Sequence, residues 1–395
     1  MQFLTNFLNE DWSDRPAGPR IYLGAFGKHP GWNDHFDLGL ETESLVAAKR
    51  ILYEQGIRAE IEAQTWEKLP EVDRLPEFDH WFLWLRPRET LLGCFWSSRD
   101  GKGRSLYPLV LCAHLVDLPL GWAWSTVVPM LQYEIAAIRA ASTAGRVVST
   151  VAETLDDLRS QHPETASREA AGFVGSAGIA SLGRAIREDK FMLYPIYNDI
   201  IDRFSPFAPG VCNFKSGPQA PRSQSIRLPA INGSFADTLN AWSGFLMSEL
   251  DPGVPLLAIM PAAGEWADFI LGQPAGGDLF RVRAGRRHLA LVTEQSRKPT
   301  PRLEPLVSQK LSELENLDLP RRRFSTASHR CVTFSMLQIG SMPFAPAGKA
   351  SSGAFLATPN PVRFRSLPAI KSNQAPPCYP QENIRLPAPD SLRAR

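Results

Sequence analysis

Cysteine is scarce in this chain of 395 residues, and its five copies are widely spaced. They are an odd number with no CxxC pair, and they fall at Cys94, Cys112, Cys212, Cys331 and Cys378. This pattern excludes a dense disulfide framework and a zinc knuckle, and it favours a reducing compartment. We therefore expect a cytoplasmic protein.

Long apolar runs are also missing. No stretch approaches the roughly 18 uninterrupted apolar residues of a membrane-spanning helix. The first residues, MQFLTNFLNEDWSDRP, lack the basic leader and the apolar run that are typical of a signal peptide. We expect neither a membrane span nor a secretory leader.

The chain lacks a strong overall charge, since its formal net charge is only +2. Residues 296–395 differ from the rest, with fifteen Lys or Arg, six Asp or Glu and fourteen of the 34 prolines. Such a composition predicts a mostly disordered, basic, Pro-rich tail. Binding of nucleic acid is a minor alternative confined to this tail, because basic runs in disordered tails are usually solvated.

The remaining sequence predicts an α+β fold. Strands are expected at 21–27, 80–87, 90–100 and 106–116, the middle two forming a hairpin, and helices at 41–57 and from about 125. Strand and helix order with short turns favours a largely antiparallel mixed sheet flanked by helices. We predict a flexible leader (1–19), an α+β domain (20–145), a second α/β region packed on it (146–295) and the tail (296–395).

The second region again mixes both element types. Its predicted helices are 148–161, 180–201 and 235–250. Its predicted strands are 226–230, 254–261 and 278–284, with a short unit around 264–274.

One loop concentrates polar side chains directly after the first predicted strand. The stretch GAFGKHPGWNDHF, residues 24–36, contains His29, Asp34 and His35. Together with Asp79 or His80 they could ligate a metal, which gives the alternative hypothesis of a metal-dependent hydrolase. The His-x5-His spacing is no recognised clamp, however, and Pro30 indicates a turn.

Other catalytic patterns are absent. The segment GAFGKHP lacks the GxxxxGK[ST] spacing of a phosphate loop, and no GxSxG elbow occurs. Paired carboxylates lie in polar segments, where solvation explains them. We therefore expect a non-enzyme without cofactor or metal.

Tryptophan is abundant by contrast, with ten copies, seven of them within residues 32–124. Trp81 and Trp84 are three apart in one predicted strand, so they should lie on opposite faces of the sheet. We expect most of the tryptophans in the core, and an exposed one as an anchor for a partner.

Two short motifs resemble the TagF family, the accessory and regulatory proteins of bacterial type VI secretion. The first is a strand entering a Gly-Lys-x-Pro turn with a downstream aspartate, here Gly27, Lys28, Pro30 and Asp34. The second is GRSLYPLVL, a Gly-Arg followed by an aromatic-Pro-Leu strand from Gly103. The similarity covers roughly residues 21–140. It departs from the family's Gly-Asp-Phe run, because this chain reads NDHF from Asn33.

The resemblance implies an adaptor without enzymatic activity. Such a protein binds another component of the secretion machine, for example a forkhead-associated scaffold, and restrains assembly. The expected structural and partner loop comprises Gly27, Lys28, Pro30, Trp32, Asp34, Phe36 and Arg104. Within it, Gly27 permits tight backbone geometry, Pro30 fixes the turn, and Asp34 bonds loop N–H groups or pairs with Arg104.

Overall fold

The structure is a computed structural model, and it describes residues 18–161, 182–183, 190–211, 222–231, 234–262, 264–294 and 300–317. The expectations for the leader up to residue 17 and for the tail beyond residue 317 lie outside the described residues. By internal contacts the chain divides into Met1–Phe324 and Ser325–Arg395, and everything below concerns the first unit.

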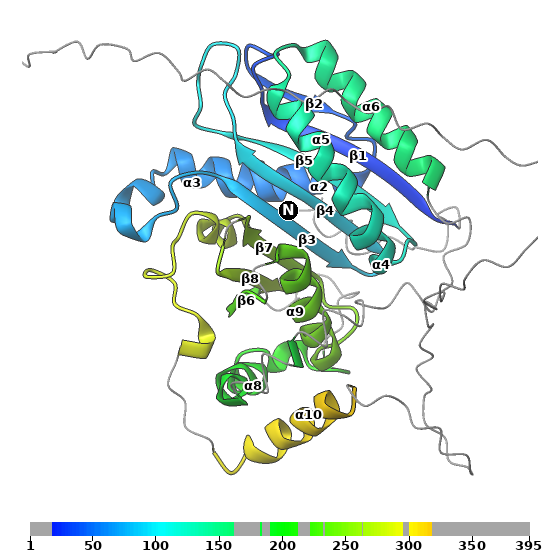
Figure 1. The fold of residues 1–395 in the computed structure, drawn as a ribbon. Helices are drawn as coiled ribbons and strands as arrows, with labels where there is room; N and C mark the ends of the chain where they lie inside the picture. Colours follow the sequence, from blue (N-terminus) through cyan, green and yellow to red (C-terminus); the bar gives the residue numbers. More distant parts are fainter. Residues whose placement is uncertain are drawn as a thin grey trace, which may run out of the picture. The chain divides into compact units, whose positions relative to one another are not determined.

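A single sheet of eight strands organises this unit (Figure 1). Its order is β2-β1-β5-β4-β3-β7-β8-β6, and all the neighbours pair antiparallel. The strands are β1 (Arg20–Lys28), β2 (His35–Leu38), β3 (Asp79–Arg86), β4 (Glu89–Ser97), β5 (Pro108–Val116), β6 (Gln224–Pro229), β7 (Leu256–Pro261) and β8 (Trp266–Leu271). The predicted α+β class with a largely antiparallel sheet is confirmed, as is the hairpin of β3 and β4.

Helices follow most of the predicted periodic segments. They are α2 (Glu43–Ala48), α3 (Ala59–Glu62), α4 (Leu120–Trp122), α5 (Val128–Ala140), α6 (Ala144–Gln161), α8 (Leu193–Asp202), α9 (Phe235–Glu249) and α10 (Glu304–Leu317). Two π-helical segments, η2 (Lys49–Arg58) and η5 (Ala123–Val127), make α2–η2–α3 and α4–η5–α5 continuous helical stretches. Within the described part of the chain, no helix has the length and apolarity needed to cross a membrane.

The strands of the two predicted regions belong to the same sheet. Strand β3, from the first region, pairs with β7, from the second, with Phe82 opposite Ile259 in the register. The boundary expected at residue 145 falls within the first turn of α6, and the sheet contains strands from both sides of it.

Each face of the sheet carries its own hydrophobic core. Trp81 and Leu83 point to the first face, where α5, α6, α8 and α9 pack. Phe82 and Trp84 point to the second face, covered by α2, η2 and η9 (Gly276–Val282). The prediction that Trp81 and Trp84 lie on opposite faces is confirmed, and both side chains are buried.

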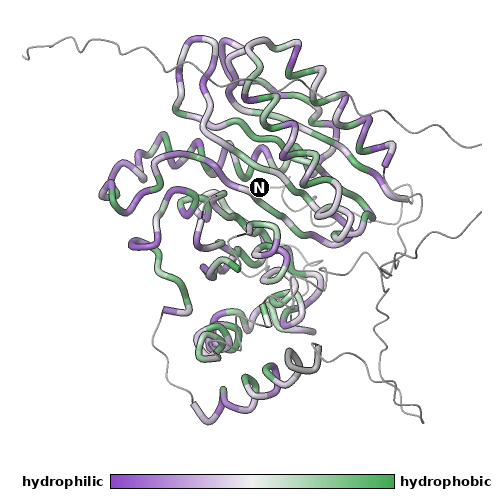
Figure 2. The backbone as a smooth tube through the Cα atoms, in the orientation of Figure 1, coloured by the Kyte–Doolittle hydropathy of each residue, from purple (hydrophilic) through white to green (hydrophobic). Residues whose placement is uncertain are grey.

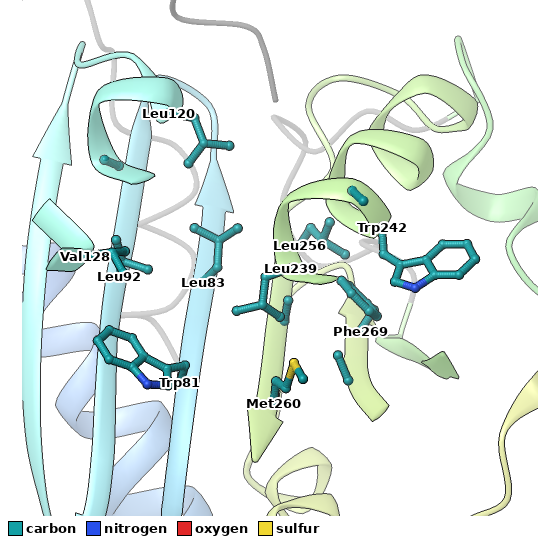
Figure 3. Packing of buried hydrophobic residues seen from close by; sticks show 14 of the residues in the cluster. Trp81, Leu83, Leu92, Leu120, Val128, Leu239, Trp242, Leu256, Met260 and Phe269 are labelled. Carbon is teal, nitrogen blue, oxygen red and sulfur yellow. The ribbon is translucent and has the colours of Figure 1, made fainter. Parts of the chain in front are cut away.

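Side chains from different helices meet on the first face. Figure 3 shows Leu120 and Val128 approaching Leu83 and Leu92, while Leu239 of α9 lies over β7. In Figure 2 hydrophilic and hydrophobic residues both occur within the turns of α5 and α6, which is the pattern of helices with one buried face.

The predicted strand at 278–284 is wrong, because this segment forms the 3-10 helix η9 and one isolated bridge from Ala284 to Arg74. Its buried residues Leu279 and Val282 are three apart, which suits a 3-10 period. The Asp278 carboxylate accepts the Ala275 backbone N–H at 2.8 Å and begins the turn.

Candidate functional site

The polar loop after β1 begins with two backbone constraints. Gly27 has φ +119, and a Cβ there would lie 2.3 Å from the Pro108 carbonyl oxygen of β5. Pro30 then occupies a turn closed by the Trp32 N–H and the His29 carbonyl at 3.0 Å. The close approach at Gly27 is the tight backbone geometry that the sequence predicted, and the role of Pro30 in fixing the turn stays a prediction.

Asp100 joins this bend to the loop between β4 and β5. Its buried carboxylate accepts hydrogen bonds from Lys28 Nζ at 2.7 Å and Arg104 Nε at 2.7 Å. The backbone N–H groups of Lys102 and Arg104 also donate to it, each at 3.0 Å. Burial opposes its charge, but the Lys28 ammonium and the other donors outweigh burial and hold the pKa of Asp100 well below its usual value.

Asp34 closes the same network from the solvent side. The Arg104 guanidinium lies 3.2 Å from its carboxylate, so the predicted Asp34–Arg104 ion pair is present. The backbone N–H of His35 donates to Asp34 at 2.9 Å, and this bond is the main reason that the pKa of Asp34 falls to about 2. Lys28 and Arg104 therefore both reach across to two carboxylates, with Asp100 buried and Asp34 exposed.

The other side of the loop is apolar and packs on the first core. Trp32 stacks on Phe36 with ring centroids 4.0 Å apart, and Phe36 is buried. A Cβ at Gly31 would lie 2.4 Å from the Ala144 backbone nitrogen at the start of α6. Of the predicted loop residues, Asp34 and Arg104 are exposed, Trp32 is half-buried, and Lys28 and Phe36 are buried.

The histidines of the metal hypothesis have other partners. His29 Nε2 lies 3.0 Å from the Ile138 carbonyl oxygen, and its Nδ1 accepts the Gly31 N–H at 3.0 Å. His80 is buried in β3 and stacks on Phe95, and burial lowers its pKa to about 3. Across the residues that the structure describes, no three His, Cys, Asp or Glu side chains form a group that could hold a metal ion.

A cavity of about 690 Å³ opens beside this network, at the second face of the sheet. Its charged or polar lining includes Lys28, Asp34, His35, Arg104 and Arg283. Its apolar walls come from Pro76, Phe78, Leu106 and Tyr107. The Lys28 ammonium lies 5.4 Å from the centre of the Tyr107 ring, so aromatic and cationic surfaces meet in its floor.

Arg283 is a third cationic side chain of the cavity, and it lies far along the sequence from Lys28 and Arg104. Its Nε and Nη2 donate to the carbonyl oxygens of Leu75 at 3.0 Å and Pro76 at 2.8 Å. The guanidinium lies 5.3 Å from the ring centre of Phe78. No carboxylate of the described residues forms an ion pair with it, and burial, together with the Arg74 charge, lowers its pKa.

Sequence reasoning missed Asp100, Leu106 and Arg283. Asp100 opens DGKGRS, the polar stretch between the strands expected at 90–100 and 106–116, and an aspartate at the first position of a turn often bonds the following N–H groups. No sequence feature places Arg283 in the site, because its segment, residues 278–284, predicts a strand.

A second polar cluster is buried at the opposite end of β4. Ser44 donates to the Glu89 carboxylate at 2.7 Å, and Arg86 lies 3.4 Å from the same group. Burial opposes ionisation, but the nearby His114 and Arg86 side chains and the Ser44 hydrogen bond outweigh it and lower the pKa of Glu89 to about 2. Thr42 Oγ1 contacts His114 at 2.9 Å and caps α2, so this cluster anchors the start of that helix.

Comparison with protein-family models finds no match to this chain. A comparison with curated proteins finds none either.

Proposed function

We propose that this protein is a non-catalytic bacterial accessory protein of the TagF type, which regulates type VI secretion through contact with another protein in the cytoplasm. The observation that carries the proposal is the convergence of the two motifs on one site. Gly27 pairs with Leu109 in the sheet, and Arg104 bridges Asp34 and Asp100. Residues some seventy positions apart thereby shape one surface.

The bonding pattern at the site favours binding over catalysis. Asp100 already accepts four hydrogen bonds, and His29 uses both ring nitrogens. A general base must reach the proton that it removes, and these groups are directed to other parts of the chain. What they do instead is hold the loop between β1 and β2 against the loop between β4 and β5.

The proposed partner is a forkhead-associated scaffold or another secretion component. The full chain, immobilised and exposed to lysate of a host bearing the secretion genes, should capture such a protein, identified by mass spectrometry. Capture should fall when Asp34 and Arg104 are both replaced by Ala, and it should persist when the distant exposed pair Arg58 and Glu62 is replaced in the same way. Recovery of ribosomal background alone would reject the proposal.

The metal-dependent hydrolase hypothesis has its own test. Elemental analysis of the purified chain should show no stoichiometric zinc or manganese. A metal present at one equivalent and lost in His35→Ala would replace the adaptor proposal.

A further inference from the structure

The cavity beside the Asp100 network has an excess of positive charge. Its lining contains Lys28, Arg104, Arg283 and the exposed Asp34, and the buried Asp100 binds Lys28 and Arg104, so these five groups carry a formal charge of plus one. Both carboxylates are bound by Lys28 and Arg104. Arg283 has no carboxylate in ion-pair contact among the described residues, and Glu67 and Glu77 act on it only at longer range.

The guanidinium of Arg283 is held in place by carbonyl oxygens and aromatic rings, with no carboxylate of the described residues in direct contact. Two carbonyl oxygens fix its Nε and Nη2, and the Trp66 and Phe78 rings lie 5.7 Å and 5.3 Å from its centre. Within the described part of the chain, its Nη1 has no hydrogen-bond partner, and neither has that of Arg104. A fixed guanidinium with unused donors is suited to an incoming oxyanion, since planar N–H groups match carboxylate geometry.

The apolar walls suggest what the anion is attached to. Leu106 is 52% exposed at the rim, next to Tyr107 and opposite Pro76 and Phe78. A site that combines a few fixed polar groups with aromatic and aliphatic walls binds a group that is itself partly apolar. A cavity of about 690 Å³ is large enough for a few residues of extended peptide.

We propose that this cavity binds a glutamate or aspartate side chain, flanked by apolar residues, in an extended segment of a partner protein. The proposal rests on the proposed function, because it supplies the chemistry by which the adaptor recognises its partner. Arg283 and Arg104 bind the carboxylate, and Leu106, Phe78 and Pro76 contact the flanking residues. A dianionic phosphate fits less well, because these five groups carry a charge of only plus one and the exposed Asp34 carboxylate lines the same cavity.

Short peptide pools test the assignment on the full chain. Each pool carries Glu, Gln or phosphoserine at the centre, with Ala, Ser, Leu and Phe mixed at the flanking positions. The immobilised chain should retain the Glu pool about tenfold more than the Gln pool, as expected for hydrogen bonds to a charged group. Equal retention of the Glu and Gln pools, or stronger retention of the phosphoserine pool, would overturn it.

Variants locate the binding. Arg283→Gln should lose the Glu preference, whereas Arg302→Gln, an exposed arginine outside the cavity, should keep it. Because Arg283 also bonds backbone carbonyls, Leu106→Glu provides a second variant at an exposed position. Its added carboxylate should repel the Glu pool without a change in the thermal midpoint. Retention of the Glu pool by folded L106E protein would contradict the assignment.

The two proposals can fail separately. A Glu preference that depends on Arg283, seen in a chain that captures no secretion component, would support the cavity assignment and reject the proposed function. Capture of a secretion component that is unchanged in both R283Q and L106E would do the reverse.

Discussion

At the scale of single residues, Asp100 has more structural consequence than any of the residues that the motifs name. It is buried, and it bonds Lys28 and Arg104 at 2.7 Å each. Its loss leaves the buried Lys28 ammonium without its main counter-ion, and an uncompensated buried charge is strongly destabilising. Asp34 contacts the same arginine from solvent, where an ion pair contributes little.

This contrast gives a matched pair of variants. Asp100→Asn should lower the thermal unfolding midpoint by several degrees, while Asp34→Asn should change it by about a degree or less. Differential scanning calorimetry at neutral pH measures both. Equal shifts of the thermal midpoint in the two variants would show that the buried carboxylate of Asp100 contributes no more to stability than the exposed one of Asp34.

Glu89 determines part of the stability at acid pH. Its pKa in the folded protein is about 2, against an ordinary value of 4.5. A depressed carboxyl pKa contributes stability that is present above pH 4.5 and is lost as the pH falls toward 2. For a buried side chain this amounts to about 3 kcal/mol.

The test is urea unfolding at a series of pH values. The free energy of unfolding of the wild type should fall steeply between pH 4.5 and 2.5, and Glu89→Gln should flatten this fall. A variant with the wild-type slope would assign the acid sensitivity to other groups.

At the scale of elements, the start of α6 is fitted against the bend after β1. Gly31→Ala places a Cβ against backbone atoms of Thr143 and Ala144, which have no room to rotate away. We expect a loss of about 1–3 kcal/mol in the free energy of unfolding. Gly145→Ala, at the next position of α6 after Ala144, meets nothing within 4 Å and should be neutral or slightly stabilising.

Chemical denaturation of both variants measures the difference. If G31A and G145A unfold at the same urea concentration, the loop is not packed against α6 as described.

The elements with a clear local period were predictable from the sequence. The β3–β4 hairpin follows from its aromatic-rich runs and short polar turn, and α9 from its apolar stripe with Ser234 as cap. The helix expected from about Ser125 begins at Leu120, because α4 and the π-helical η5 precede α5. The prediction of a strand at 278–284 is wrong, because the buried residues Leu279 and Val282 are three apart and fit a 3-10 helix as well as a short strand.

The candidate site was predictable only where its contacts are local or charge-complementary. Asp34 and Arg104 could be paired from the two motifs. The position of Arg283 beside Phe78 depends on a fold that brings residues some two hundred positions apart together. No local pattern encodes that contact.

At the scale of the whole described unit, the sheet makes the two predicted regions interdependent. Without β7, strand β3 keeps β4 but loses the neighbour on its other side, and Trp81 loses the Phe235 ring stacked at 4.3 Å. The fragment 18–145 should therefore show no cooperative unfolding transition, whereas 18–317 should show one. Circular dichroism in urea distinguishes them, and a sharp transition in the shorter fragment would mean that residues 20–145 fold independently.

Amide hydrogen exchange gives the most direct test of the main structural claim, that one buried aspartate locks two loops into a rigid surface. The account predicts slow exchange at residues 29–36 and 100–104 in the wild type. In Asp100→Asn both segments should lose protection together, while Asp34→Asn should leave them protected. Rapid exchange in the wild type, or loss of protection in only one of the two loops, would contradict it.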